Sequence, residues 1–305
     1  MNTDRIKNIM IVLLSAAIVA FSVLIVMEGD RYTLTVAMEE NVAAVLDRNN
    51  MSISTEIVRD FNPRRQLSLE FYDYDLEGIA ARFFGDAVPP REFMQNTIEY
   101  YCEHTGKIMT HNNRSGSIFF GVPNGMFVGV CGGDFYKNAA SAEALARTFV
   151  EEVLGADVMP LHSTILTRQG NYVITFFEGY GDYLMFNNQI RVRITDMGVV
   201  YVFYSRMQSH GFAGYAQPIF SADEMLITLL AHLRAEGYEK QDHISVIDMQ
   251  LVYAFDAHAG ISRGVPAYFF TISIGTEVWI YYRVFNAHTG RPIHGETTLI
   301  SGPHL

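Results

Sequence analysis

Residues 221–233 read SADEMLITLLAHL and residues 141–153 read SAEALARTFVEEV, so one pattern occurs twice at an interval of 80 residues. Each copy places apolar residues at positions i, i+3, i+4, i+7, i+8 and i+11, which is the stripe of a helix buried on one side. We therefore expect two amphipathic helices. The apolar residues are Ala142, Leu145, Ala146, Phe149, Val150 and Val153 in the first copy, and Ala222, Met225, Leu226, Leu229, Leu230 and Leu233 in the second.

Residues that favour helix ends flank both stripes. Ser141 and Ser221 stand where an N-cap is expected, and Glu224 completes a capping box with Ser221. Gly155 and Gly237 follow the stripes, where glycine commonly ends a helix. The sequence thus predicts where each helix begins and ends.

A shorter third helix is expected after Asp75, with Gly85 at its end. Its apolar face consists of Leu76, Ile79, Ala80, Phe83 and Phe84.

The segments that follow the helices alternate apolar and polar residues, as in IRVRIT at 190–195, which predicts strands with one buried face. The others are 172–177, 199–204, 245–255, 267–274 and 277–285. A helix followed by antiparallel strands is an α+β layer, in which the helix stripe covers one face of the sheet. The fold class we expect is α+β, built from repeats of this unit.

The N-terminus contains an uncharged run of twenty residues, NIMIVLLSAAIVAFSVLIVM at 8–27. As a helix it would span about 30 Å, the thickness of the hydrocarbon core of a bilayer. Arg5 and Lys7 precede the run and Glu28 follows it, so the positive-inside rule places the N-terminus in the cytoplasm. We expect one uncleaved transmembrane helix, with the rest of the chain on the extracytoplasmic side of the cell membrane.

The alternative to an anchor is a cleaved signal peptide, whose apolar stretch usually covers about 7 to 15 residues and ends at small residues. Ala17 and Ala20 lie inside the run, and bulky residues continue past them to Met27. This pattern favours the anchor.

One face of this expected helix collects small side chains, and Ala16 and Ala20 form a small-xxx-small pair that lets another helix approach closely. We predict that this stripe contacts a partner transmembrane helix, although a helix that faces lipid on all sides explains the alanines equally well. The stripe consists of Ile9, Leu13, Ala16, Ala20, Val23 and Met27.

The charge balance excludes a nucleic-acid partner, because phosphate binding needs clustered cations. The net charge is −11 with only 22 Lys and Arg residues, and the pair Arg64-Arg65 is assigned to a solvated turn. Two cysteines, Cys102 and Cys131, permit one disulfide, and two buried thiols are an equal alternative.

The expected organisation has four parts. These are a cytoplasmic head at 1–7, the transmembrane helix at 8–27, an N-terminal subdomain at 31–138 and a C-terminal subdomain at 139–305 with two helix-sheet repeats. The boundary is set by the glycines around Gly132-Gly133.

No pattern of catalytic residues or ligands stands out. The histidines lack metal-binding spacing, and His288 and His294 are interpreted as surface residues beside a turn. Ser115 and Ser117 lie in a polar loop without a nucleophile motif.

Two further candidates for chemistry have simpler structural explanations. Asp73 and Asp75 are assigned to a strand edge or an N-cap, and the glycines at 129–133 to a turn. We expect no catalytic, cofactor-binding or metal-binding residues, and no small-molecule substrate.

The C-terminal third resembles the end of the YycI (WalI) regulators. The segments that carry the resemblance are SADE at 221–224, IDMQLVY at 247–253, VPAY at 265–268 and YRVFNAHTG at 282–290. The short basic head and the repeats extend the resemblance over most of the chain, although 50–135 match least and Tyr268 stands where we expect Trp. The same C-terminal pattern is similar to the wider PepSY-like group.

This resemblance implies a non-enzymatic protein of Gram-positive bacteria. It would adjust the WalK (YycG) sensor histidine kinase in cell-wall homeostasis, beside a companion YycH-like regulator and in contact with membrane lipid. The alternatives are a PepSY-type extracytoplasmic module that binds a protease or a wall polymer, and an enzyme of wall metabolism.

Overall fold

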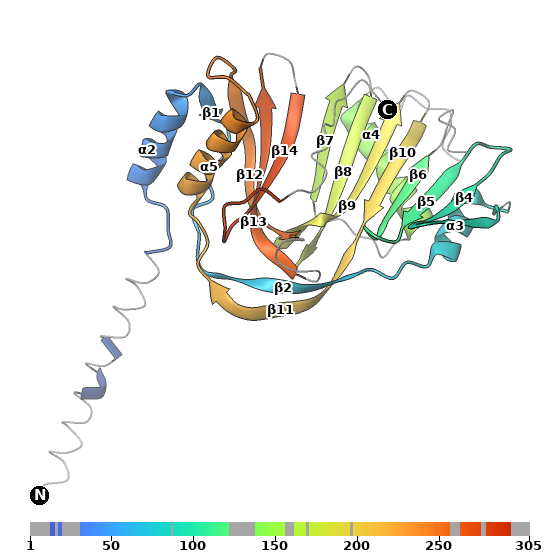
Figure 1. Cartoon of the computed structure of the whole chain (residues 1–305), viewed down its shortest axis with the longest axis horizontal. Helices are drawn as coiled ribbons and strands as arrows, with labels where there is room; N and C mark the ends of the chain where they lie inside the picture. The colour runs from blue at the N-terminus through green and yellow to red at the C-terminus, as the bar shows by residue number, and fades with distance from the viewer. Residues whose placement is uncertain are drawn as a thin grey trace, which may run out of the picture.

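The computed structural model describes residues 13–15, 18–19, 31–86, 88–121, 138–155, 162–168, 171–195, 198–256, 263–275 and 279–293. The fold is α+β, with one large mixed sheet and helices packed against it (Figure 1). The helices are α2 (Val36–Asp47), α3 (Leu76–Phe84), α4 (Ala139–Phe149) and α5 (Ala222–Ala235). One π-helical turn, η2 (Val150–Leu154), continues α4.

The sheet has 14 strands, in the order β11-β2-β13-β12-β9-β10-β6-β5-β4-β3. Off this path, β1 pairs with β12, β14 with β13, and β8 with β7 and β9. The strands are β1 (Met51–Ile53), β2 (Arg64–Phe71), β3 (Arg91–Met94), β4 (Thr97–Tyr101), β5 (Ile108–Asn112), β6 (Ser117–Gly121), β7 (His162–Arg168), β8 (Asn171–Tyr180), β9 (Tyr183–Thr195), β10 (Gly198–Ser205), β11 (Met207–Gln217), β12 (Ile244–Phe255), β13 (Arg263–Ile274) and β14 (Trp279–Asn286).

One hydrophobic core lies between the helices α2 and α5 and the strands β12, β13 and β14. All six apolar stripe residues of α5 are buried in it, together with Val42 and Leu46 of α2. Tyr268, Phe270 and Ile272 of β13 alternate toward this core. The apolar stripe therefore covers one sheet face, as expected from its period.

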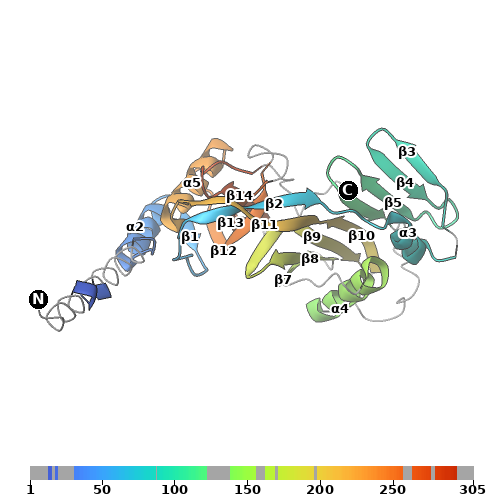
Figure 2. The same ribbon diagram turned by 90° about the horizontal axis from the view of Figure 1, so that it is seen from below.

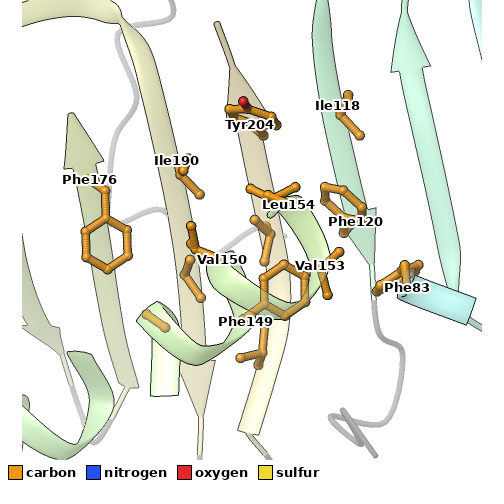
Figure 3. Packing of buried hydrophobic residues seen from close by; sticks show 14 of the residues in the cluster. Phe83, Ile118, Phe120, Phe149, Val150, Val153, Leu154, Phe176, Ile190 and Tyr204 are labelled. Carbon is orange, nitrogen blue, oxygen red and sulfur yellow. The ribbon is translucent and has the colours of Figure 1, made fainter. Parts of the chain in front are cut away.

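A second core lies between α3, α4 and the antiparallel strands from β4 to β10. The stripe residues of α4 and η2 are buried there between Phe176 and Ile190 on one side and Phe83 and Phe120 on the other (Figure 3). Both helices lie on the same side of this part of the sheet (Figure 2). The other side carries no helix among the described residues.

The strands β2 and β11 form a long antiparallel ribbon that joins the two parts of the sheet. β2 also pairs with the start of β13, and only Arg206 separates β11 from β10. In Figure 1 the ribbon runs beneath both groups of strands. Leu67 and Leu69 of β2 are buried beside Met185 and Tyr253, so the ribbon has a core of its own.

The expected transmembrane helix is not found among the described helices. Among the described residues, no helix combines the length and the hydrophobicity needed to cross a bilayer. The described helices are short and amphipathic because they cover sheet faces. The run at 8–27 lies outside the described residues except for 13–15 and 18–19. The predicted fold class is corrected to a mixed α+β fold around one large sheet.

The predicted start of α5 is confirmed, but the predicted start of α4 is not. The capping box of α5 is present, with the Ser221 amide donating to Glu224 Oε2 at 2.9 Å. For α4 the prediction of Ser141 as N-cap was wrong, because the N-cap is Asn138, whose side chain accepts from the Ser141 amide at 2.8 Å. The helix thus begins one turn earlier.

Two further predictions from the sequence have different outcomes. Arg64 and Arg65 begin β2, so their assignment to a turn was wrong. The predicted division at 138 stays a prediction, and the core beneath α3 and α4 takes residues from both sides of that position.

Candidate functional site

The side of β4 to β10 that faces away from α3 and α4 carries a row of aromatic and arginine side chains. Directly paired residues of antiparallel strands project from the same face. Phe203 of β10 pairs with Phe119 of β6 and with Arg191 of β9. Two residues away, Tyr201 pairs with Arg193. We call Phe119, Tyr201, Phe203, Arg191 and Arg193 the arginine–aromatic face.

Strict alternation along each strand places these side chains opposite the core. Val192 and Ile194 of β9 are fully buried beneath the helices, so Arg191 and Arg193 point to the other side. On β10, Val202 points to the core while Tyr201 and Phe203 do not. Each of the five residues of the face is partly exposed.

The rings of the face contact one another and one of the guanidinium groups. The Phe119 ring centroid lies 5.1 Å from that of Phe203 and 6.2 Å from that of Tyr201. The Arg191 guanidinium lies 5.9 Å from the Phe203 ring centroid, and it donates to Gln189 Oε1 at 3.0 Å. The aromatic rings and the Arg191 side chain therefore form one connected surface.

The face is locally cationic in a chain whose net charge is −11. Arg193 forms no ion pair with another described residue. The first acidic residue along the row that contains Arg191 is Glu99 on β4, four strands away, and Glu92 on β3 follows it. At roughly 4.8 Å a strand this separation is about 19 Å, which exceeds the Debye length of about 8 Å at physiological salt. Glu99 and Glu92 therefore lie too far away to pair with the two arginines.

A separate set of polar side chains is buried on the helix side of the sheet, away from this face. The Tyr74 ring centroid lies 5.2 Å from that of Tyr204 and 5.7 Å from that of His111. Burial raises the pKa of Tyr74 and of Tyr204, and it lowers the pKa of His111 below its usual value of 6.5. These shifts favour the neutral forms of the three side chains.

The predicted transmembrane stripe lies almost wholly outside the described residues. Leu13 is helical and 64% exposed, whereas Ile9, Ala16, Ala20, Val23 and Met27 are not described. The stripe stays a prediction. Cys131, His294 and the glycines at 129–133 also lie outside the described residues, and Cys102 is a free thiol.

The residues considered for chemistry have structural roles where they are described. Asp75 caps α3 and accepts from the Gly78 amide at 2.9 Å, as the N-cap interpretation predicted, while Asp73 lies outside any strand. His288 Nδ1 lies 2.9 Å from the Pro218 carbonyl oxygen. Ser117 is buried in β6. In the described ranges, no group of three or more His, Cys, Asp and Glu residues is placed to hold a metal ion.

Several residues that carry the resemblance meet at the start of α5. The Tyr268 hydroxyl donates to the Phe220 carbonyl at 2.9 Å, and the Phe220 amide donates to the Ala287 carbonyl at 2.8 Å. The Ala287 amide in turn donates to the Pro266 carbonyl at 2.8 Å. This corner therefore ties β13, the turn after β14 and α5 together, which gives its residues a structural role.

The sequence pattern had already placed Arg191 and Arg193 on the solvent side of a strand. It gave no sign that Phe119 would lie beside them, because β6 is more than 60 residues distant along the chain. Only the pairing of β6 with β10 assembles the face.

No family model and no curated protein sequence matches the chain. Among solved structures, an uncharacterized protein from Eubacterium rectale shares the fold, with a TM-score of 0.51 and 12% identity over 83% of this chain and 98% of the other. The C-terminal domain of YpeB from Bacillus megaterium has a TM-score of 0.36 at 12% identity, over 73% and 96%. YycH from Bacillus subtilis has a TM-score of 0.42 at 11% identity, over 73% of this chain and 55% of YycH.

Proposed function

We propose that this protein is a non-enzymatic regulator that acts at the extracytoplasmic side of the cell membrane and adjusts the activity of a sensor histidine kinase. The observation that carries the proposal is the arginine–aromatic face, a sheet surface whose partly exposed side chains are of the kinds found where proteins bind partners. Aromatic residues and arginine are enriched where proteins bind partners. The resemblance of the C-terminal third to the YycI regulators supports the choice of a kinase as the regulated protein.

The proposal predicts that the gene and the face both affect kinase output. Deleting the gene should change expression of the cell-wall hydrolase genes, because the kinase would lose its regulator. The variant Arg191→Gln with Arg193→Gln should shift expression in the same direction while the protein level is unchanged. Arg31→Gln with Arg48→Gln removes the same charge from exposed positions near α2 and serves as the matched control.

The test measures transcript levels of the hydrolase genes in four strains: the parent, the deletion strain and the two double variants. Unchanged expression in the deletion strain, with a normal envelope, would contradict a regulatory role. Equal effects of the two double variants would show that the face is not the functional surface.

A second candidate is a PepSY-type extracytoplasmic module that binds or inhibits a protease. It is favoured by the corner at α5, whose Pro266, Tyr268 and Asn286 to Gly290 pattern is similar to the PepSY-like group. Adding the purified chain to an extracytoplasmic protease preparation tests it. Dose-dependent inhibition that leaves kinase output unaffected would favour this function.

A further inference from the structure

We propose that the outer edge of β3 binds an extended segment of another protein, in which a lysine or arginine lies between two apolar residues. The segment would add one strand to the sheet at this edge. The inference goes beyond the proposed regulatory function, and it involves no residue of the arginine–aromatic face.

The strand β3 is the last strand of the sheet, and its one neighbour is β4 (Figure 2). All four residues of β3 are exposed, and the exposed fractions of Phe93 and Met94 are 69% and 49%. No other described segment is hydrogen-bonded to the backbone of Arg91 or Phe93. A strand with one free side can pair with an added strand, so this edge is accessible to a partner.

The hydrogen bonds around β4 show how its backbone groups are directed. The Asn113 amide donates to the Asn96 carbonyl at 2.8 Å, so in the pair of Thr97 with Asn112 the backbone groups of the two residues point away from each other. Thr97 therefore directs its amide and carbonyl to the other neighbour of β4, which is β3. There it pairs with Met94.

This orientation alternates along β3. Glu92 and Met94 direct their backbone groups to β4, whereas Arg91 and Phe93 direct theirs to the free side. The amides and carbonyls of Arg91 and Phe93 are thus spaced like those of the hydrogen-bonded pairs in an antiparallel ladder. An added strand would satisfy all of these groups.

The Phe93 side chain favours an apolar residue in the added strand. Phe93 lies in one row with Ile98 and Ile118, on the side of the sheet that α3 and α4 cover. Ile118 is fully buried and Ile98 is partly buried, so Phe93 is the exposed end of an apolar row. An apolar residue opposite Phe93 would cover its ring and extend the core.

The charge of the segment follows from Glu92 and Glu99, which project from the other side of the sheet. They are directly paired, and like charges in this position repel each other. In the part of the chain that the structure describes, neither carboxylate forms an ion pair. A lysine or arginine opposite Glu92 would reduce the repulsion between the two carboxylates.

A second copy of this chain fits the edge less well than such a segment. If two β3 strands paired so that all outward groups were used, Arg91 of each copy would face Phe93 of the other, and the two copies of Glu92 would face each other. This register would place Glu92 and Glu99 of both copies in one row. The register that brings the two copies of Phe93 together needs Gln95 in the strand, but its φ is +32°.

Binding of the full chain to short synthetic peptides tests the proposal. The probe is acetyl-TTVKVTT-amide, and we expect the form with glutamate in place of lysine to bind about tenfold more weakly, because it would face Glu92. Methylating the backbone nitrogens of both valines should abolish binding, since these nitrogens would donate to β3. The control is methylation of the backbone nitrogen of the lysine, which would point away from β3 and should leave binding intact.

Variants of the edge test its two side chains. Glu92→Lys should reverse the preference, so that the glutamate peptide binds more tightly than the lysine peptide. Glu40→Lys makes the same change of charge at an exposed position of α2 and should bind like the parent. Phe93→Thr keeps a residue that favours strands and should weaken binding of the lysine peptide about fivefold, because the apolar contact is lost.

Hydrogen exchange locates the bound peptide. The amides of Arg91 and Phe93 should exchange quickly in the free chain, and at least about tenfold more slowly when the lysine peptide is bound. The amides of Glu92 and Met94 should change less, because they already donate to β4.

Four outcomes would overturn the proposal. The first three are no binding of the lysine peptide up to about 1 mM, equal binding after methylation of the valines, and unchanged exchange of the Arg91 and Phe93 amides in the bound state. The fourth is dimerisation of the parent that Phe93→Thr abolishes in sedimentation experiments, which would assign the edge to a second copy. None of them depends on kinase output, so the regulatory proposal keeps its own test.

Discussion

Arg206 and Glu178 form an ion pair, with 3.0 Å between Arg206 Nε and Glu178 Oε2, at the residue where β10 gives way to β11. The Glu178 side chain is only 11% exposed, and the Arg206 guanidinium lies 4.5 Å from the Tyr72 ring centroid. Asn188 accepts from the Met207 amide at 2.8 Å and donates to its carbonyl at 2.9 Å. These contacts fix the ribbon to the sheet.

Replacing Arg206 with Met should destabilise the protein by about 3 kcal/mol, because it leaves the Glu178 carboxylate buried without its cation. The control is Arg59→Met, which breaks the Arg59 to Glu39 pair at a site where the Arg59 side chain is 62% exposed. That change should cost less than about 1 kcal/mol. Urea unfolding of both variants measures the difference, and equal costs would show that the junction pair is not special.

Replacing Asn138 with Ala should destabilise α4 by about 1 kcal/mol, because its side chain caps the Ser141 amide. Ser141→Ala should change stability by less than about 0.5 kcal/mol, since Ser141 lies inside the helix. Thermal unfolding of the two variants measures this. A larger loss of stability for Ser141→Ala would instead support Ser141 as the N-cap, as the sequence predicted.

Stability should fall as the pH drops below 6.5, and His111 should account for part of that loss. Burial lowers its pKa in the folded state, so the unfolded chain takes up the proton first as the pH falls. The stabilising contribution of His111 is complete above pH 6.5. It is lost as the pH falls toward the lower pKa of His111 in the folded state. His111→Gln should make the urea midpoint less dependent on pH between 7 and 5. The exposed His243→Gln is the control, and an unchanged pH dependence in His111→Gln would contradict the prediction.

Leu229→Ala should cost about 2 to 5 kcal/mol, because Leu229 of α5 is fully buried and leaves a cavity. Ile227 lies two residues earlier on the same helix and is 39% exposed. Ile227→Ala should therefore change stability by about 0.5 kcal/mol or less. Chemical denaturation of the pair tests which side of α5 faces the sheet, and similar costs would contradict the packing.

The helices α3, α4 and α5 could be predicted because their information is local, whereas α2 was not predicted. The positions from Ala222 to Leu233 repeat with the period of a helix, and the structure buries all six of them. The strand at 190–195 was predicted for the same reason, since Ile190, Val192 and Ile194 alternate toward the core. In both cases a period within one segment determines which side is buried.

The ribbon and the arginine–aromatic face could not be predicted because their information is not local. β11 reads MQSHGFAGYAQ, with glycines at 211 and 214, and its apolar residues do not alternate with polar ones as in a half-buried strand. Its partner β2 begins with two arginines, which suggested a turn. The face likewise depends on the pairing of Phe119 with Phe203, which no property of either segment indicates.

The pairing of β2 with β11 also determines when β2 can fold during synthesis of the chain. Glu70 pairs with Gln208, so about 140 residues must be synthesised after β2 before its partner exists. Closing so large a loop is slow, because its entropy is lost before any contact compensates. A nascent or truncated chain that ends before 207 would carry β2 as an unpaired edge with Leu67 and Leu69 uncovered. Such a chain would be open to proteases and chaperones until the ribbon closes.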